Sequence, residues 1–246
     1  MSYYKIVTQN KIFVDAREAT TDSRDAQIDA LRGFVIALMA LDHARDFFSA
    51  DALRFSATDL AHTYPSLFLT RIITHLCAPT FVLLAGLSAY LWSRKHPLQE
   101  ARRYFALRGF WLILIDVTII SPIWTHQIGK FGLDVLSAIG FGFLSLATAL
   151  SLPPRAILFI GIFISLSHDL ADGFHAEYFG NFGPLWSLLH ERGPLPFGVN
   201  GQVHYPIFPW IGILFSGFGI GPLFLRADVK RREKWANSCG IIIILA

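Results

Sequence analysis

Cysteine and charged residues are both scarce in this chain. Only two cysteines occur among the 246 residues, and both, Cys77 and Cys239, fall within apolar stretches. Two isolated cysteines exclude a disulfide framework and a cysteine-based zinc motif. Asp, Glu, Lys and Arg together make up only 16% of the sequence. A soluble domain of this length needs more polar surface, so the composition argues against a soluble protein.

The start of the chain lacks the order of a secretory signal, in which a basic beginning is followed by an apolar run. Residues 1–28 are instead polar and mixed in charge. We found neither an internal repeat nor a low-complexity linker. We therefore expect residues 1–28 to form a cytosolic N-terminal segment and residues 29–246 to form one transmembrane domain.

Hydrophobic residues make up 53% of the chain, and its mean hydropathy is +0.47. A membrane-spanning helix needs about 20 mostly apolar residues. The sequence predicts an all-α polytopic helix bundle of about seven spans. A seventh span begins near Trp235 and stops at Ala246, which predicts truncation at the C-terminus. Six spans precede it: Asp29–Phe48, Leu67–Trp92, Gly109–Trp124, Leu133–Leu152, Pro154–Leu170 and Tyr205–Leu225.

Basic residues are distributed unevenly between the loops of this topology. Most of them face the cytosol if the N-terminus is cytosolic, which agrees with the positive-inside rule. The opposite loops carry few, such as Lys130 and Arg192. The sequence pI of about 9.0 then reflects attraction to anionic lipid rather than to nucleic acid. We expect a lipid bilayer as partner and no nucleic acid, and the sequence does not indicate an oligomeric state.

The first predicted span carries four polar side chains within two turns of one end. Each charged group inside a bilayer costs roughly 2.5–3.5 kcal/mol on insertion scales, so such groups usually mark a site. At i,i+3 spacing, Arg45 can neutralise Asp42, and Asp46 can fix the tautomer of His43. A similar pair, Asp29 and Arg32, is expected to be an interfacial anchor.

The second predicted span presents Arg71 and His75 at i,i+4 spacing. Adjacent helices joined by a short loop usually pack antiparallel, so these groups could share one pocket with those of the first span. Pro79 should free a backbone carbonyl near His75 and kink the helix. A purely structural role for the intramembrane histidines, satisfied by a neighbouring helix, remains open.

Two further features concern the predicted extracytoplasmic side. Seven of the nine histidines lie on or near it, and the sixth span opens with His204, Tyr205 and two prolines, which make a stiff rim. The segment 172–201 is rich in Gly, Pro and aromatic residues and is too long for a simple turn, which is typical of lids and binding elements. Pro153 and Pro154 predict the start of a helix.

Four motifs in this order resemble bacterial membrane proteins related to the catalytic domain of heparan-α-glucosaminide N-acetyltransferase. They begin at Asp29 (DALRG), Leu38 (LMALDHARDFF), Leu69 (LTRIITHLCAPTFVLLAG) and Tyr205 (YPIFPWIG). The resemblance covers roughly residues 27–226. It implies a transmembrane acyltransferase of the bacterial cytoplasmic (inner) membrane. Such an enzyme passes an acetyl or acyl group from cytosolic acetyl-CoA to an amine or hydroxyl, on a sugar or cell-envelope glycan, on the other side.

On this resemblance, His43 is the general base or briefly carries the acyl group, and Asp46 orients it. His75 is a second proton-transfer group. His62, in the loop after the first span, competes for the catalytic role because eukaryotic members use a loop histidine there. We expect no metal. The remaining predictions are substrate-binding residues Asp42, Arg45, Arg71, His204, Tyr205 and Trp210, and CoA-binding residues Arg94, Lys95, Arg102 and Arg103.

Two other functions stay open at this point. A non-enzymatic, proton-coupled transporter or flippase of a polar or lipid-linked molecule would use the same Asp, His and Arg residues as a binding site. A haem held between His43 and His75 would need both imidazoles at matched depth, and the neighbouring Arg and Asp side chains would compete for them. Activity that depends on acyl-CoA would favour the enzyme. Substrate flux driven by a proton gradient would favour the transporter, and a Soret absorption band would favour the haem protein.

Overall fold

The computed structural model describes residues 28–51, 54–125, 129–196 and 199–226 and is mostly helical. The chain divides into two compact units, Met1–Phe81 and Val82–Ala246. The division falls within α3 (Cys77–Ser93). The predicted boundary between residues 28 and 29 stays a prediction, because residues 1–27 lie outside the described part.

The first unit contains a helix over residues 28–48, the turns that follow it, and α2 (Pro65–His75). Pro65 occupies the first turn of α2, where its missing N–H costs nothing. Helix α2 ends at His75 and α3 begins at Cys77. Pro79 explains this break, because its ring has no N–H to donate and clashes with the carbonyl four residues earlier, that of His75. The predicted kink is therefore confirmed.

The second unit begins within α3, and its described residues form four further long helices, several short ones and a small sheet. Helix α7 starts at Pro154, as the proline pair predicted. The elements after α3 are α4 (Leu98–Ile115), η1 (Asp116–Ile120), α5 (Ser121–Thr125), β1 (Phe131–Leu133), α6 (Val135–Ala149), α7 (Pro154–Ser167), η2 (His168–Ala171), η3 (Ala176–Phe182), α8 (Gly183–Leu189), β2 (Gly193–Pro194), β3 (Gly201–Val203), α9 (Ile207–Gly219) and α10 (Gly221–Arg226).

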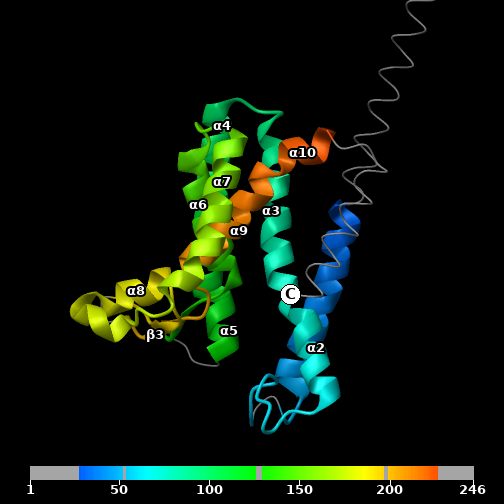
Figure 1. Ribbon diagram of the computed structural model, residues 1–246, viewed down its shortest axis with the longest axis vertical. Coiled ribbons are helices and arrows are strands. Elements are labelled where there is room, and N and C mark those ends of the chain that lie inside the picture. The colour runs from blue at the N-terminus through cyan, green and yellow to red at the C-terminus, as the bar shows by residue number, and fades with distance from the viewer. Residues whose placement is uncertain (1–27, 52–53, 126–128, 197–198, 227–246) are drawn as a thin grey trace, which may run out of the picture. The chain divides into compact units, whose positions relative to one another are not determined.

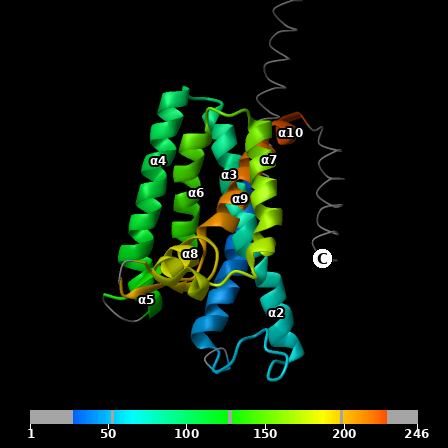
Figure 2. The ribbon, with the colours of Figure 1, turned by 60° about the vertical axis from the view of Figure 1, so that its left-hand side comes forward.

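The helices of this unit form one bundle. Helix α4 packs along α6, α6 packs against α9, and α9 packs along α7, an arrangement visible in Figures 1 and 2. The side chains of Phe105, Leu146, Ile157 and Leu214 are fully buried between them. Burying one such side chain away from water stabilises the fold by about 1.5–3 kcal/mol. Where the helices lie in lipid, dispersion contacts between the packed side chains hold the bundle together instead.

Helices α3 and α9 approach so closely that only glycine fits at the crossing. A Cβ added at Gly86 would overlap the carbonyl oxygen of Leu214, and one added at Gly217 would overlap the carbonyl oxygen of Leu83. The two helices therefore contact each other backbone to backbone, which is the usual way that small residues promote packing between membrane helices.

A three-stranded sheet in the order β1-β3-β2 lies at one end of the bundle. Strand β3 pairs with β1 in parallel and with β2 antiparallel, and Leu133 lies opposite Val203. The sheet ties the residues just before α6 to those just before α9. It therefore gives the segment 172–201 a fixed anchor at its C-terminal end.

In the part of the chain that the structure describes, four helices are long and apolar enough to cross a membrane: Pro65–Ser93, Leu98–Thr125, Pro154–Ala171 and Ile207–Leu225. Within the described ranges, the predicted span Leu133–Leu152 is shorter than expected, because Leu133 belongs to β1 and the apolar helix is only Val135–Ala149. The predicted span Asp29–Phe48 is helical but carries five charges. The seventh predicted span and Cys239 lie outside the described residues, and the cytosolic N-terminus stays a prediction.

The α3–α9 crossing yields a stability prediction. Gly86→Ala should lower the free energy of unfolding by about 1–3 kcal/mol, because a methyl group forces the helices apart. Gly33→Ala is the matched control, since its added Cβ meets nothing within 4 Å and alanine favours a helix by about 1 kcal/mol. Thermal unfolding of both variants in detergent tests this, and equal melting temperatures would show that the crossing is not tight.

Candidate functional site

Charged and polar side chains from the helix over residues 28–48 and from α2 meet in the first unit. We call this group the Asp42 cluster. It lies where the two helices face each other, in the half of the first helix that approaches its C-terminal end. Its members are Asp42, His43, Arg45, Asp46, Arg71 and Thr74.

Asp42 is the centre of the cluster. Its carboxylate forms ion pairs with Arg45 Nη2 at 2.6 Å and with Arg71 Nη1 at 3.1 Å, and it accepts a hydrogen bond from the Thr74 hydroxyl at 2.6 Å. The side chain is only 15% exposed. A buried charge needs partners in place of the water that it loses on folding. Two guanidinium groups and a hydroxyl take that place for this carboxylate. The predicted neutralisation of Asp42 by Arg45 is confirmed.

The two arginines of the cluster differ in how many of their N–H groups are engaged. Arg45 uses Nη2 for Asp42, Nη2 and Nε for Asp46, and Nη1 for Thr74, and its side chain is 9% exposed. Within the described residues, Arg71 bonds only through Nη1, and its side chain is 31% exposed. Arg71 therefore keeps N–H groups available for a ligand, while Arg45 braces the cluster.

His43 lies beside both carboxylates. One donor atom each from Asp42, His43 and Asp46 lie within 4.8 Å of one another. Asp46 Oδ1 accepts hydrogen bonds from Arg45 at 2.7 Å and 3.2 Å, so its position is fixed. The imidazole thus stands next to two anchored negative groups. That Asp46 orients His43 stays a prediction.

The structure does not bring every predicted catalytic histidine into this cluster. Thr74 of α2 is buried and joins it, but the neighbouring His75 is exposed and makes no hydrogen bond or ion pair to any described residue. Helical geometry explains the difference, because Arg71 and Thr74 are three residues apart and face the first helix together.

The competing candidate His62 is an exposed loop residue. Its Nδ1 lies 2.8 Å from Asp59 Oδ2. This hydrogen bond, together with the one from the backbone N–H of Ala61, holds the pKa of the Asp59 carboxyl below its usual range. His62 therefore has its own carboxylate partner within the loop.

The predicted rim residues belong to the second unit. His204 Nδ1 lies 2.9 Å from Asp134 Oδ1, and the N–H groups of His204 and Tyr205 both donate to the Leu133 carbonyl. The rings of Tyr205 and Trp210 lie 5.1 Å apart. The residues before α9 are thus held by Asp134 and by the Leu133 carbonyl, and the stiffness expected from the prolines stays a prediction.

Asp116, which the sequence analysis did not select, is fully buried at the start of η1. Its Oδ2 accepts hydrogen bonds from the N–H groups of Asp134, at 2.8 Å, and Ser137, at 3.0 Å. These are among the unpaired donors at the N-terminus of α6, where a negative charge is favoured by the helix dipole. Asp116 therefore caps α6 from another helix, and an acidic residue inside an apolar run was its only signal.

The predicted CoA-binding residues lie where α3 ends and α4 begins. Arg94, Lys95 and Arg103 are exposed. Arg102 is half-buried and donates to the hydroxyl of Ser151, in the turn between α6 and α7. One end of the second unit therefore carries a group of basic side chains, of which Arg102 has a structural partner.

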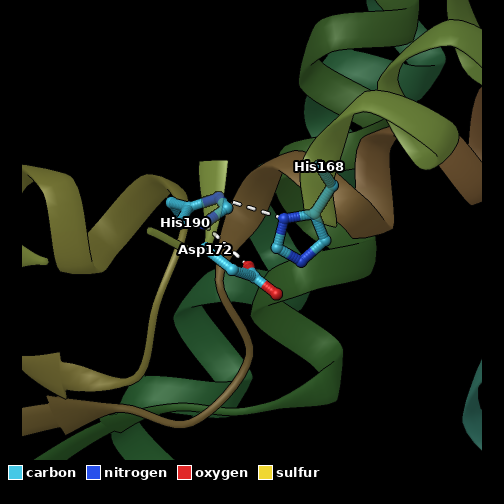
Figure 3. A group of neighbouring side chains, drawn as sticks. All are labelled: His168, Asp172 and His190. Atoms are coloured by element: carbon cyan, nitrogen blue, oxygen red, sulfur yellow. Dashed lines mark hydrogen bonds and ion pairs between the residues drawn. The ribbon is translucent and has the colours of Figure 1, made fainter. Parts of the chain in front are cut away.

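Another group that the sequence analysis missed consists of His168, Asp172 and His190, which meet at the other end of the bundle (Figure 3). Within the described residues, this group and the trio of Asp42, His43 and Asp46 are the two whose donor atoms are close enough to share a metal ion. The two histidines of this group are 22 residues apart, so no local sequence spacing predicts that they meet.

The sequence profile of the family described as heparan-alpha-glucosaminide N-acetyltransferase, catalytic, matches residues 24–245. No curated protein and no solved structure matches the chain. The profile spans the Asp42 cluster, the rim and the basic end of the second unit.

The Asp42 cluster yields a prediction about stability. Asp42→Asn should lower the free energy of unfolding by about 3–5 kcal/mol, because it leaves two partly buried guanidinium groups without their shared counter-charge. The control is Asp29→Asn, since Asp29 is 67% exposed in its pair with Arg32 and should cost at most about 1 kcal/mol. Thermal unfolding in detergent distinguishes the two, and equally small losses would contradict the central role of Asp42.

Proposed function

Because this chain belongs to the heparan-alpha-glucosaminide N-acetyltransferase catalytic family, whose members are transmembrane acetyltransferases, we propose a specific reaction for it. An acetyl or acyl group passes from cytosolic acyl-CoA to an amine or hydroxyl acceptor on the extracytoplasmic side. The acceptor is a small molecule, a sugar or a cell-envelope glycan, and the membrane is the bacterial cytoplasmic (inner) membrane. The apolar helices support membrane insertion.

The observation that carries this proposal is the Asp42 cluster, which sets a histidine beside two anchored carboxylates. In the direct form of the reaction, His43 accepts the proton of the acceptor N–H or O–H. The freed lone pair attacks the thioester carbonyl carbon, and the CoA thiolate leaves. In the two-step form, the His43 nitrogen attacks the thioester and expels the thiolate. The acceptor then attacks the resulting acyl-imidazole and takes the acyl group.

The charges of the cluster suit both forms. Arg45 and Arg71 balance Asp42 and Asp46, so the cluster is neutral when His43 is neutral. A proton or acyl group on His43 adds one positive charge, which the two neighbouring carboxylates stabilise. The positive charge in turn attracts the negative charge that develops on the thioester oxygen and on the departing thiolate.

Arg71 is the group we assign to that developing oxyanion. It is partly exposed, and within the described residues its Nη2 and Nε N–H groups are not used by the cluster. An N–H donor that is already held in place by Asp42 costs no reorganisation during the reaction. Arg45 and Thr74 act on the reaction only by positioning Asp42 and Asp46.

The exposed basic residues Arg94, Lys95 and Arg103 are suited to attract the phosphate groups of CoA. Exposed charges act at a distance, so this attraction raises the rate of encounter and is screened by salt. Arg102 supports them from its fixed place beside Ser151. The rim residues His204, Tyr205 and Trp210 are proposed to contact the acceptor, His75 is a second proton-transfer group, and His62 is the alternative catalytic histidine that the test below decides against His43.

His43→Ala tests the catalytic assignment. Acetyl transfer from labelled acetyl-CoA to glucosamine, measured in proteoliposomes, should fall about 10²–10⁴-fold, the usual cost of losing a general base. His62→Ala should keep activity, and His175→Ala, at an exposed residue outside the cluster, controls for nonspecific effects. Full activity of a correctly inserted His43→Ala variant would refute the assignment, and loss in His62→Ala alone would transfer the role to the loop.

Arg71→Ala should lower kcat about 10²–10³-fold with little change in KM, because an oxyanion donor acts mainly in the transition state. Arg71→Lys should restore part of the activity by its charge but not the planar donor geometry. Steady-state kinetics of the two variants test this. A rise in KM with unchanged kcat would contradict the oxyanion role and indicate that Arg71 binds substrate in its ground state.

A further inference from the structure

His168, Asp172 and His190 form a compact group in the second unit, separate from the residues assigned to acyl transfer. We propose that these three side chains bind one divalent transition-metal ion of the Zn²⁺ type. The proposal does not depend on the acyltransferase function, since none of the three has a role in that reaction.

Local structure places the three residues. His168 begins the short helix η2 directly after α7, and Asp172 follows the last residue of η2. His190 follows the last residue of α8, where its N–H donates to the Trp186 carbonyl at 2.8 Å. The ends of two helices thus bring the two imidazoles and one carboxylate together, and Figure 3 shows them facing a common space.

The distances suit a shared ion. His190 Nε2 lies 3.2 Å from Asp172 Oδ1, and the Nδ1 atoms of the two histidines lie 3.0 Å apart. One donor atom from each residue lies within 4.8 Å of the others. Around a tetrahedral Zn²⁺ with bonds of about 2.0–2.1 Å, ligand atoms lie about 3.3 Å apart. His190 meets Asp172 through Nε2 and His168 through Nδ1, so it can give only one of these two nitrogens to a shared ion, and the other ligands must move toward that nitrogen.

The two imidazole rings are not stacked on each other. They stand almost perpendicular to each other, at 87°, with centroids 4.4 Å apart. The His190 side chain is 4% exposed and packs near the Trp186 ring at 4.8 Å. Asp172 is 65% exposed. One ligand is therefore fixed in the protein interior, while the carboxylate side is open for an ion to enter and for a fourth ligand.

Charge distinguishes this group from the Asp42 cluster. There, two arginines already neutralise the carboxylates and would repel a cation. Here, Asp172 has an ion pair only with His190 among the described residues, so the group carries a net negative charge when both imidazoles are neutral. Two imidazoles and a carboxylate are ligands typical of Zn²⁺ and related ions, and an open position would allow the ion to bind water or a substrate oxygen.

The test measures metal content and affinity rather than enzymatic activity. The detergent-purified full chain, stripped with a chelator and titrated with Zn²⁺, should bind one equivalent. Co²⁺ titration should produce visible absorption bands of a low-coordinate site. Asp172→Asn and His168→Gln alter side chains that are not deeply buried, so both variants should fold. Each should weaken binding at least 10–100-fold, the range seen for second-shell losses alone.

His175→Gln is the matched control, because His175 contacts Glu191 in the same region but lies outside the group. It should leave the Zn²⁺ affinity unchanged. The proposal is overturned if the wild-type chain binds less than half an equivalent of Zn²⁺. It is equally overturned if folded Asp172→Asn and His168→Gln variants retain wild-type affinity, or if His175→Gln alone loses the ion.

Discussion

Neutralising a carboxylate between two apolar helices is the constraint on which the proposed site depends. Asp42 sits on a helix whose other faces carry large apolar side chains, so it needs partners inside the protein. Arg45 and Thr74 each lie within 2.6 Å of it, and Arg71 lies at 3.1 Å. Removing this carboxylate would leave Arg71 without a counter-charge and Arg45 with Asp46 alone, which is why the whole cluster depends on it. Because His43 lies beside Asp42 and Asp46, the same contacts determine the charges around its imidazole.

The two units serve different parts of the proposed reaction. The first unit provides the neutral ionic cluster, in which a new positive charge on His43 meets two fixed carboxylates. The second unit is a tightly packed bundle with basic side chains at one end and an ordered sheet and histidine-rich segment at the other. In the proposed reaction, the basic end of this bundle attracts the CoA donor and the rim before α9 contacts the acceptor.

The sequence predicted local features better than tertiary ones. Helical spacing identified the pair of Arg45 and Asp42, and Pro79 predicted the break after His75, because both effects act within one turn. Hydropathy misjudged the fourth span, since it does not register that Leu133 pairs in a sheet with Val203. Spacing placed Thr74 and His75 on one face with Arg71, but only Thr74 is buried and contacts Asp42, while His75 is exposed.

The residues that were missed share one cause. Asp116 caps a helix that begins 18 residues or more along the chain, and His168 meets His190 only because two helix ends converge. No periodicity connects residues at such separations. Their chemistry follows from tertiary structure alone, which a single sequence does not supply.

The most direct test of the central claim is the thermal shift of the detergent-purified protein with acetyl-CoA, with ATP as the control for nonspecific phosphate binding. A ligand at 100 times its Kd stabilises the folded state by about 2.7 kcal/mol, which is readily detected. We expect acetyl-CoA and CoA to raise the melting temperature and ATP to leave it unchanged. A folded protein whose melting temperature responds to none of them, or equally to all three, would contradict acyl transfer from CoA.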